Sequence, residues 1–155
     1  SENVWDDYEQ KIKDYLELKP ENEDVFFNYQ FYFNASIDYA ASLRQVFYAH
    51  LATNDIDAVI APLSKFSNFV KNGFFVPLSD QLPTDLYSSL TDKFYLSGTE
   101  DDARISPYGI YLTDTTLFRE NSSADTDDPY LIGIVSNSNN KKNAIEFIRF
   151  LYNEN

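Results

Sequence analysis

Strand-like and helix-like hydrophobic patterns alternate along the first half of this chain, and their order most constrains its fold. Residues 25–33 place apolar side chains at every second position, which is typical of a strand. Residues 36–51 repeat them at helical spacing. A continuously apolar run at 58–61 predicts a second, buried strand, and a helix from Pro62 to a stop at Asn72-Gly73 follows. This order predicts a right-handed parallel βαβ unit.

The second half of the chain has shorter and less regular patterns. They predict a short helix after Thr84, an interrupted extended segment at 105–112, a buried strand at 130–135 and an amphipathic helix at 144–152. We therefore expect an α/β fold with a mainly parallel central sheet and helices on both faces. A helix within residues 1–20 is expected to pack on the single domain formed by residues 21–155.

Charge and cysteine content exclude several classes of function. The 155 residues hold 12 basic and 25 acidic side chains, a net charge of −13, which repels nucleic acid and anionic membrane surfaces. There is no cysteine, so disulfides, thiolate metal sites and thiol nucleophiles are excluded. No stretch approaches the ~20 apolar residues that span a bilayer. Because the chain starts at Ser1, we expect an upstream segment, such as a signal peptide or a membrane anchor.

Catalytic and metal-binding motifs are not recognisable in the sequence. His50 is the only histidine, and it lies at the rim of a helical apolar stripe, where a structural role is favoured. Asp125, Asp127 and Asp128 cluster, but the glycine and distal glutamate of a calcium-binding loop are missing, so a solvated loop is favoured. No glycine-rich loop that could bind phosphate is present. We expect no enzyme activity, no cofactor and no metal.

The candidate ligand-binding residues follow from the predicted sheet and from the tyrosines. In open parallel sheets, ligands bind beyond the carboxyl ends of the strands, where helix N-termini offer free N–H groups. Tyrosine adds a ring with a hydrogen-bonding tip, suited to sugars, peptides and protein surfaces. The predicted site consists of Tyr32, Asn34, Ser36, Pro62, Ser64 and Tyr108.

Several segments together resemble extracellular solute-binding proteins of the type 2 periplasmic class. The resemblance is carried by Asp57-Ala-Val-Ile-Ala-Pro62, by Phe66 to Leu82 with its Asn72-Gly73-Phe74 turn and Pro77-Leu78, by Tyr108-Gly109-Ile110, and by Ile134 to Leu151. These pieces fall within residues 24–152. The family has two lobes and about twice this length or more, and residues 90–103 are too few for a second lobe. The resemblance therefore implies a single lobe, without closure of two lobes around a solute.

Two functions follow as expectations. The first is non-catalytic, extracytoplasmic binding of a small polar solute, such as a sugar, by a secreted or lipoprotein-like bacterial surface protein with a transporter permease as partner. The second is a protein-interaction or sensing ectodomain of a membrane-anchored bacterial protein. A concave aromatic pocket would favour a solute, whereas a flat exposed aromatic patch would favour a protein partner. An orphan hydrolase is a third alternative, and it would need a carboxylate pair in a pocket.

Overall fold

A computed structural model describes residues 10, 14, 49, 51–54, 56–115 and 127–153. Gln10 and Asp14, within the first predicted helix, are both helical. The predicted strand at 25–33 and His50 lie outside the described residues. Leu51 and Ala52 form the end of the helix predicted at 36–51, and Asn54 follows with a φ of 63°.

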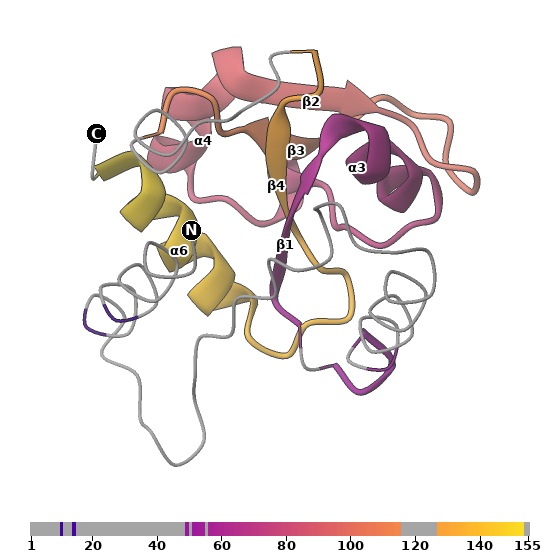
Figure 1. The fold of residues 1–155 in the computed structure, drawn as a ribbon, viewed down its shortest axis with the longest axis horizontal. Coiled ribbons are helices and arrows are strands. Elements are labelled where there is room, and N and C mark those ends of the chain that lie inside the picture. The colour runs from indigo at the N-terminus through magenta and orange to yellow at the C-terminus, as the bar shows by residue number, and fades with distance from the viewer. Residues whose placement is uncertain are drawn as a thin grey trace.

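The described elements follow the predicted order closely, with one additional strand (Figure 1). They are strand β1 (Ala58–Pro62), helix α3 (Leu63–Lys71), 3₁₀ helix η2 (Leu78–Asp80), helix α4 (Thr84–Leu90), 3₁₀ helix η3 (Thr91–Lys93), strand β2 (Phe94–Ser97), strand β3 (Ser106–Tyr111), strand β4 (Tyr130–Ile134) and helix α6 (Lys141–Asn153). The predicted stop of α3 is confirmed, with Asn72 as its C-cap and Gly73 at φ 78°. Strand β2 was not predicted. None of the helices among these elements is long and apolar enough to cross a membrane.

The prediction of a mainly parallel sheet is wrong. The four described strands form one sheet in the order β1-β4-β3-β2, and every neighbouring pair is antiparallel. The connection between β2 and β3 explains why this pair is antiparallel. Parallel neighbours need a crossover of a dozen or more residues, usually a helix, whereas β2 and β3 are joined by only residues 98–105. Over residues 56–115 and 127–153 the fold is therefore mixed α/β, with an antiparallel four-strand sheet and three helices.

Helices cover both faces of this sheet (Figure 1). Helix α3 lies on one face, where Phe66 and Val70 pack with Val59 and Leu131. Helices α4 and α6 lie on the other, where their buried side chains pack against alternate residues of β3 and β4. The α4–α6 core contains Leu78, Leu82, Leu86, Leu90, Ile110, Leu112, Ile132, Ile134, Ala144, Ile148, Phe150 and Leu151.

Two strand glycines let α3 approach the sheet closely. The fully buried ring of Phe66 lies over Gly109 of β3 and Gly133 of β4. A Cβ at Gly109 would lie 2.5 Å from Cε1 of Phe66, and a Cβ at Gly133 would lie 2.9 Å from its Cζ. Phe75 stacks on the same ring, with centroids 4.5 Å apart. The glycines are therefore needed here for space, because any larger residue would displace the aromatic core.

Candidate functional site

Two residues of the predicted site, Pro62 and Ser64, lie where β1 ends and β4 begins. Pro62, the last residue of β1, pairs with Tyr130, the first residue of β4. Tyr111, the last residue of β3, pairs with Leu131. The start of α3 and the end of β3 therefore lie on either side of the start of β4. We refer to Pro62, Ser64, Tyr111, Asp128 and Tyr130 as the Pro62 end of the sheet.

Asp128 closes the N-terminus of α3. Its Oδ1 accepts a hydrogen bond from the Ser64 backbone N–H at 2.8 Å, and its Oδ2 accepts one from Ser64 Oγ at 2.7 Å. The N–H of Leu63 donates to the carbonyl oxygen of Pro129 at 2.8 Å. A carboxylate is favourable at this position because it satisfies free N–H groups and lies at the positive end of the helix dipole. The Ser64 N–H therefore bonds to a carboxylate of the chain, and the Leu63 N–H bonds to a backbone carbonyl oxygen.

Tyrosine rings line both faces of the sheet at the Pro62 end. On the α3 face, half-buried Tyr111 meets Tyr95 edge to face, with centroids 6.4 Å apart. Burial, and to a smaller extent Tyr95, raises the pKa of Tyr111. On the other face, the Tyr152 hydroxyl donates to the Tyr111 carbonyl oxygen at 2.6 Å, which fastens α6 to the end of β3. Burial raises the pKa of Tyr130 as well, and nearby Asp128 adds to the effect.

This arrangement offers hydrogen-bonding groups beside an aromatic surface. A carboxylate has about four lone-pair positions, so Asp128 keeps acceptor capacity after its two bonds to Ser64. The Ser64 hydroxyl also keeps acceptor lone pairs, and this residue is exposed. Partly exposed Tyr111 supplies a ring face or edge. Such groups suit an uncharged molecule with hydroxyl groups, whereas the negative charge of Asp128 disfavours an anion.

The structure brings together only part of the predicted site. Pro62 and Ser64 adjoin at the Pro62 end, as above. Tyr108 lies elsewhere, because it is only 4% exposed and packs in the core beneath α3. Tyr32, Asn34 and Ser36 lie outside the described residues, so their part in a site stays a prediction.

A β-bulge explains the burial of Tyr108. Tyr95 pairs with Gly109, but the next residue, Leu96, pairs with Pro107, so Tyr108 is an extra residue in β3. A bulge turns side chains from their regular alternation, and here Tyr108 joins the α3 face. The Pro107 and Gly109 neighbours that suggested a ligand-facing bend in the sequence are thus part of a bulge. Burial is the main cause that raises the pKa of Tyr108.

Sequence reasoning missed Asp128 as a member of this site. It was expected to belong to a solvated loop, because nothing in the local pattern shows that it meets Ser64, which is 64 residues away. The sequence held only a weak indication that Asp128 caps a helix. A carboxylate just before Pro129 and a buried strand is well placed to cap some neighbouring element, but the identity of that element depends on the fold.

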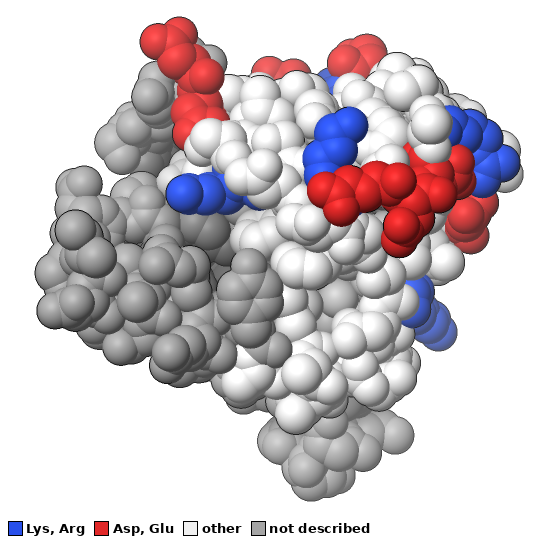
Figure 2. All heavy atoms as spheres, turned by 90° about the vertical axis from the view of Figure 1, so that its right-hand side faces the viewer, with Lys and Arg blue, Asp and Glu red and all other residues white. Residues whose placement is uncertain are grey.

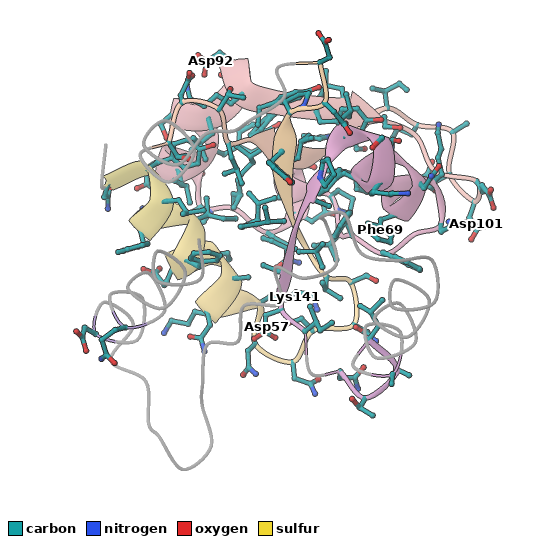
Figure 3. The ribbon with its side chains drawn as sticks, viewed as in Figure 1. Asp57, Phe69, Asp92, Asp101 and Lys141 are labelled. Atoms are coloured by element: carbon teal, nitrogen blue, oxygen red, sulfur yellow. The ribbon has the colours of Figure 1, made fainter. Side chains whose placement is uncertain are left out.

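A second polar junction lies at the opposite end of β1, where Asp57 and Lys141 are found (Figure 3). The buried Ser138 hydroxyl donates to Asp57 Oδ1 at 2.6 Å and accepts from the Asn140 N–H at 2.9 Å. Lys141 Nζ donates to the Ser138 carbonyl oxygen at 2.8 Å and not to its hydroxyl. The lysine is thus not placed to activate the serine as a nucleophile. We interpret these hydrogen bonds as structural, because they hold the start of α6 next to the start of β1.

Comparisons with known proteins find no relative of this chain. No known protein family matches the chain, and no curated protein or solved structure matches it either. Within the described ranges, no group of three or more acidic, histidine or cysteine side chains comes together as a metal site.

Proposed function

We propose that this chain is a non-catalytic, extracytoplasmic binding domain for a small, uncharged, polar solute such as a sugar, and that the Pro62 end of the sheet is its binding surface. The observation that carries the proposal is the Ser64–Asp128 pair beside the partly exposed Tyr111 ring. Sugar recognition uses this combination, since hydroxyl groups bond to carboxylates and C–H faces lie on aromatic rings.

The charge at the Pro62 end selects the ligand class. Asp128 accepts the Ser64 N–H at the start of α3, so a phosphate or a carboxylate would have to displace it there. The net charge of −13 also repels anionic ligands. A neutral ligand with several hydroxyl groups avoids both penalties.

The proposal draws only limited support from the resemblance to solute-binding proteins. The mainly parallel sheet that we expected for such a single lobe is wrong, because the described sheet is antiparallel. Its segments at 57–62 and 134–151 nevertheless supply β1 and α6, and β1 leads directly into the N-terminus of α3. The binding assignment therefore depends on the chemistry of the Pro62 end.

The proposal is tested by titrating the full chain with a panel of neutral mono- and disaccharides while amide chemical shifts are recorded. We expect the largest shifts at Ser64, Tyr111 and Tyr130, with weak affinity because one open surface covers a ligand incompletely. Asp128→Asn should weaken binding about tenfold, since a hydrogen bond to a charged group contributes roughly 1.5 kcal/mol or more. Ser88→Ala, an exposed change on α4, is the matched control and should leave binding unchanged. Shifts confined to other surfaces, or equal affinity in Asp128→Asn, would refute the assignment.

A further inference from the structure

Two exposed apolar side chains lie on the hairpin formed by β2, β3 and their connecting loop. Leu96 is 59% exposed and Ile105 is 65% exposed, and they are the exposed large hydrophobic residues of the described part of the chain. Leu96 pairs with Pro107 of β3, and Ile105 is the last residue of the connection that leads into β3. Ser97 pairs with Ser106, so Ile105 follows directly beyond the last residue pair of the hairpin, and both exposed side chains belong to the same part of it.

This apolar pair borders the outer edge of the sheet. Strand β2 is the last strand in the order β1-β4-β3-β2, and no other described strand pairs with its outer side. Proteins usually protect such an edge with lysine or proline in the strand. Strand β2 has the sequence Phe94-Tyr95-Leu96-Ser97, with neither. Among the described residues, no strand pairs with its outward N–H and C=O groups, so a further strand can pair there.

The hairpin is held in place by bonds at its tip. The Glu100 N–H donates to the Lys71 carbonyl oxygen at 3.0 Å, which ties the tip to the end of α3. Within the loop, the Thr99 N–H donates to the Asp102 carbonyl oxygen at 2.8 Å. The Arg104 N–H donates to Asp102 Oδ1 at 3.0 Å. A surface that is already ordered loses little conformational freedom when a partner binds.

The charge of the hairpin decides what kind of partner fits. Glu100, Asp101 and Asp102 are exposed at the tip, and Arg104 pairs with Asp102 at 3.4 Å. Asp101 lies beside α3 (Figure 3), next to Glu100, whose N–H bonds to the last residue of that helix. Acidic side chains gather on the same side of the molecule, with basic ones next to them (Figure 2). Counting the three carboxylates and one guanidinium, the tip has a net charge of −2.

A second copy of this chain fits the edge poorly. Each copy has a net charge of −13, so association through surfaces next to acidic tips brings like charges together. A positively charged partner gains from the same field, and steering by the carboxylates speeds its encounter. The exposed Leu96 and Ile105 would then contact apolar side chains at alternate positions of the incoming strand.

We propose that the outer edge of β2 binds an extended, cationic segment of a partner protein as an additional strand. The segment has apolar residues at alternate positions, which cover Leu96 and Ile105. Its Lys or Arg residues face Glu100 and Asp101. The acidic tip lies at the opposite end of the hairpin from Tyr111, which belongs to the Pro62 end and contacts Tyr95 of β2.

The probe for this proposal is a fluorescent heptapeptide of alternating lysine and valine, with lysine at both ends, titrated into the full chain by fluorescence anisotropy. We expect binding that weakens at least tenfold as the salt concentration rises from about 50 mM to about 500 mM. Replacing the central valine with proline removes a strand N–H and should weaken binding about tenfold. The same peptide with glutamate in place of lysine should bind at least tenfold more weakly than the lysine form.

Variants of the full chain separate the edge from general attraction to its negative charge. Leu96→Lys should weaken peptide binding about tenfold or more, because it removes apolar contact and adds repulsion at the edge. Ser88→Lys adds the same charge at an exposed position of α4 and should have less than a twofold effect. Asp101→Asn should weaken binding severalfold.

Three results would overturn the proposal. Equal loss in Leu96→Lys and Ser88→Lys would mean that net charge alone attracts the peptide. Equal affinity of the lysine, proline and glutamate peptides would mean that no strand is added. Dimers in sedimentation equilibrium that dissociate in Leu96→Lys would assign the edge to a second copy of the chain.

Discussion

Gly109→Ala tests how closely α3 packs against the sheet. The new Cβ would lie 2.5 Å and 2.7 Å from Cε1 and Cζ of Phe66, and 3.2 Å from Cδ2 of Leu131. Carbon atoms in contact are normally about 3.5 to 4.0 Å apart, so the Phe66 ring must move by about 1 Å. The ring has little room to move, because it is fully buried and stacks on Phe75 at 4.5 Å.

The expected magnitude follows from two opposing effects. Overpacking of this kind costs about 1–3 kcal/mol. Replacing glycine with alanine also restricts the unfolded chain, which stabilises the fold by roughly 0.4–1 kcal/mol. We therefore expect Gly109→Ala to lower the free energy of unfolding by about 1–2 kcal/mol, the overpacking cost less the entropic gain. Urea denaturation followed by far-ultraviolet circular dichroism measures this as a lower midpoint with an unchanged slope.

A double-mutant cycle identifies the cause. Phe66→Leu shortens the side chain that meets the new Cβ, so it should recover at least about 0.5 kcal/mol of the cost of Gly109→Ala beyond additivity. Gly73→Ala is the matched control, because nothing lies within 4 Å of its Cβ and its cost comes from the φ of 78°. Phe66→Leu should not rescue it. A Gly109→Ala chain as stable as the parent, or strict additivity with Phe66→Leu, would refute the close contact.

Four further outcomes are expected. Asp128→Ala should lower the free energy of unfolding by about 1 kcal/mol in urea denaturation, since it removes the cap of α3; a neutral effect would count against that cap. Burial, with Asp114 and Asp92 nearby, raises the pKa of Tyr152, so the folded state holds this proton more tightly than the unfolded chain does. The resulting stability is complete below the ordinary tyrosine pKa of about 10 and declines as the pH rises above it, and Tyr152→Phe should flatten that decline in urea midpoints measured up to about pH 11. EDTA should leave the melting temperature unchanged, whereas a drop reversed by calcium would reveal a site that includes Asp127 or Asp128. Small-angle scattering should show no compaction when a saturating sugar is added, and a smaller radius of gyration would indicate closure around the ligand.

Local sequence patterns predicted the individual elements well. The run at 58–61 became β1, the periodic apolar residues after Pro62 became α3, and residues 130–135 contain β4. These segments combine strong periodicity with clear ends, such as Asn72-Gly73. Strand β2 was missed because it is only four residues long and Phe94 fits the helical spacing of Leu86 and Leu90.

The arrangement of the strands was not predictable from the same patterns. Periodicity identifies a strand but does not give its direction or its neighbours. The connection lengths held more information than the strands did. Residues 98–105 are a short polar loop with no predicted helix, and this spacing favours a hairpin between β2 and β3 over a parallel pair.

The site was predicted only at Pro62 and Ser64, and the antiparallel sheet explains why. In a parallel sheet, all strands end on one side, and the free N–H groups of the following helices gather there. In this sheet β1 and β3 end at the Pro62 end, but β4 begins there, so the segment that leads into β4 also arrives at the start of α3. That segment contains Asp128, whose carboxylate bonds to Ser64. Because β4 runs opposite to β1 and β3, the Ser64 N–H meets a carboxylate of the chain, and the rule for parallel sheets could not identify Asp128 as its partner.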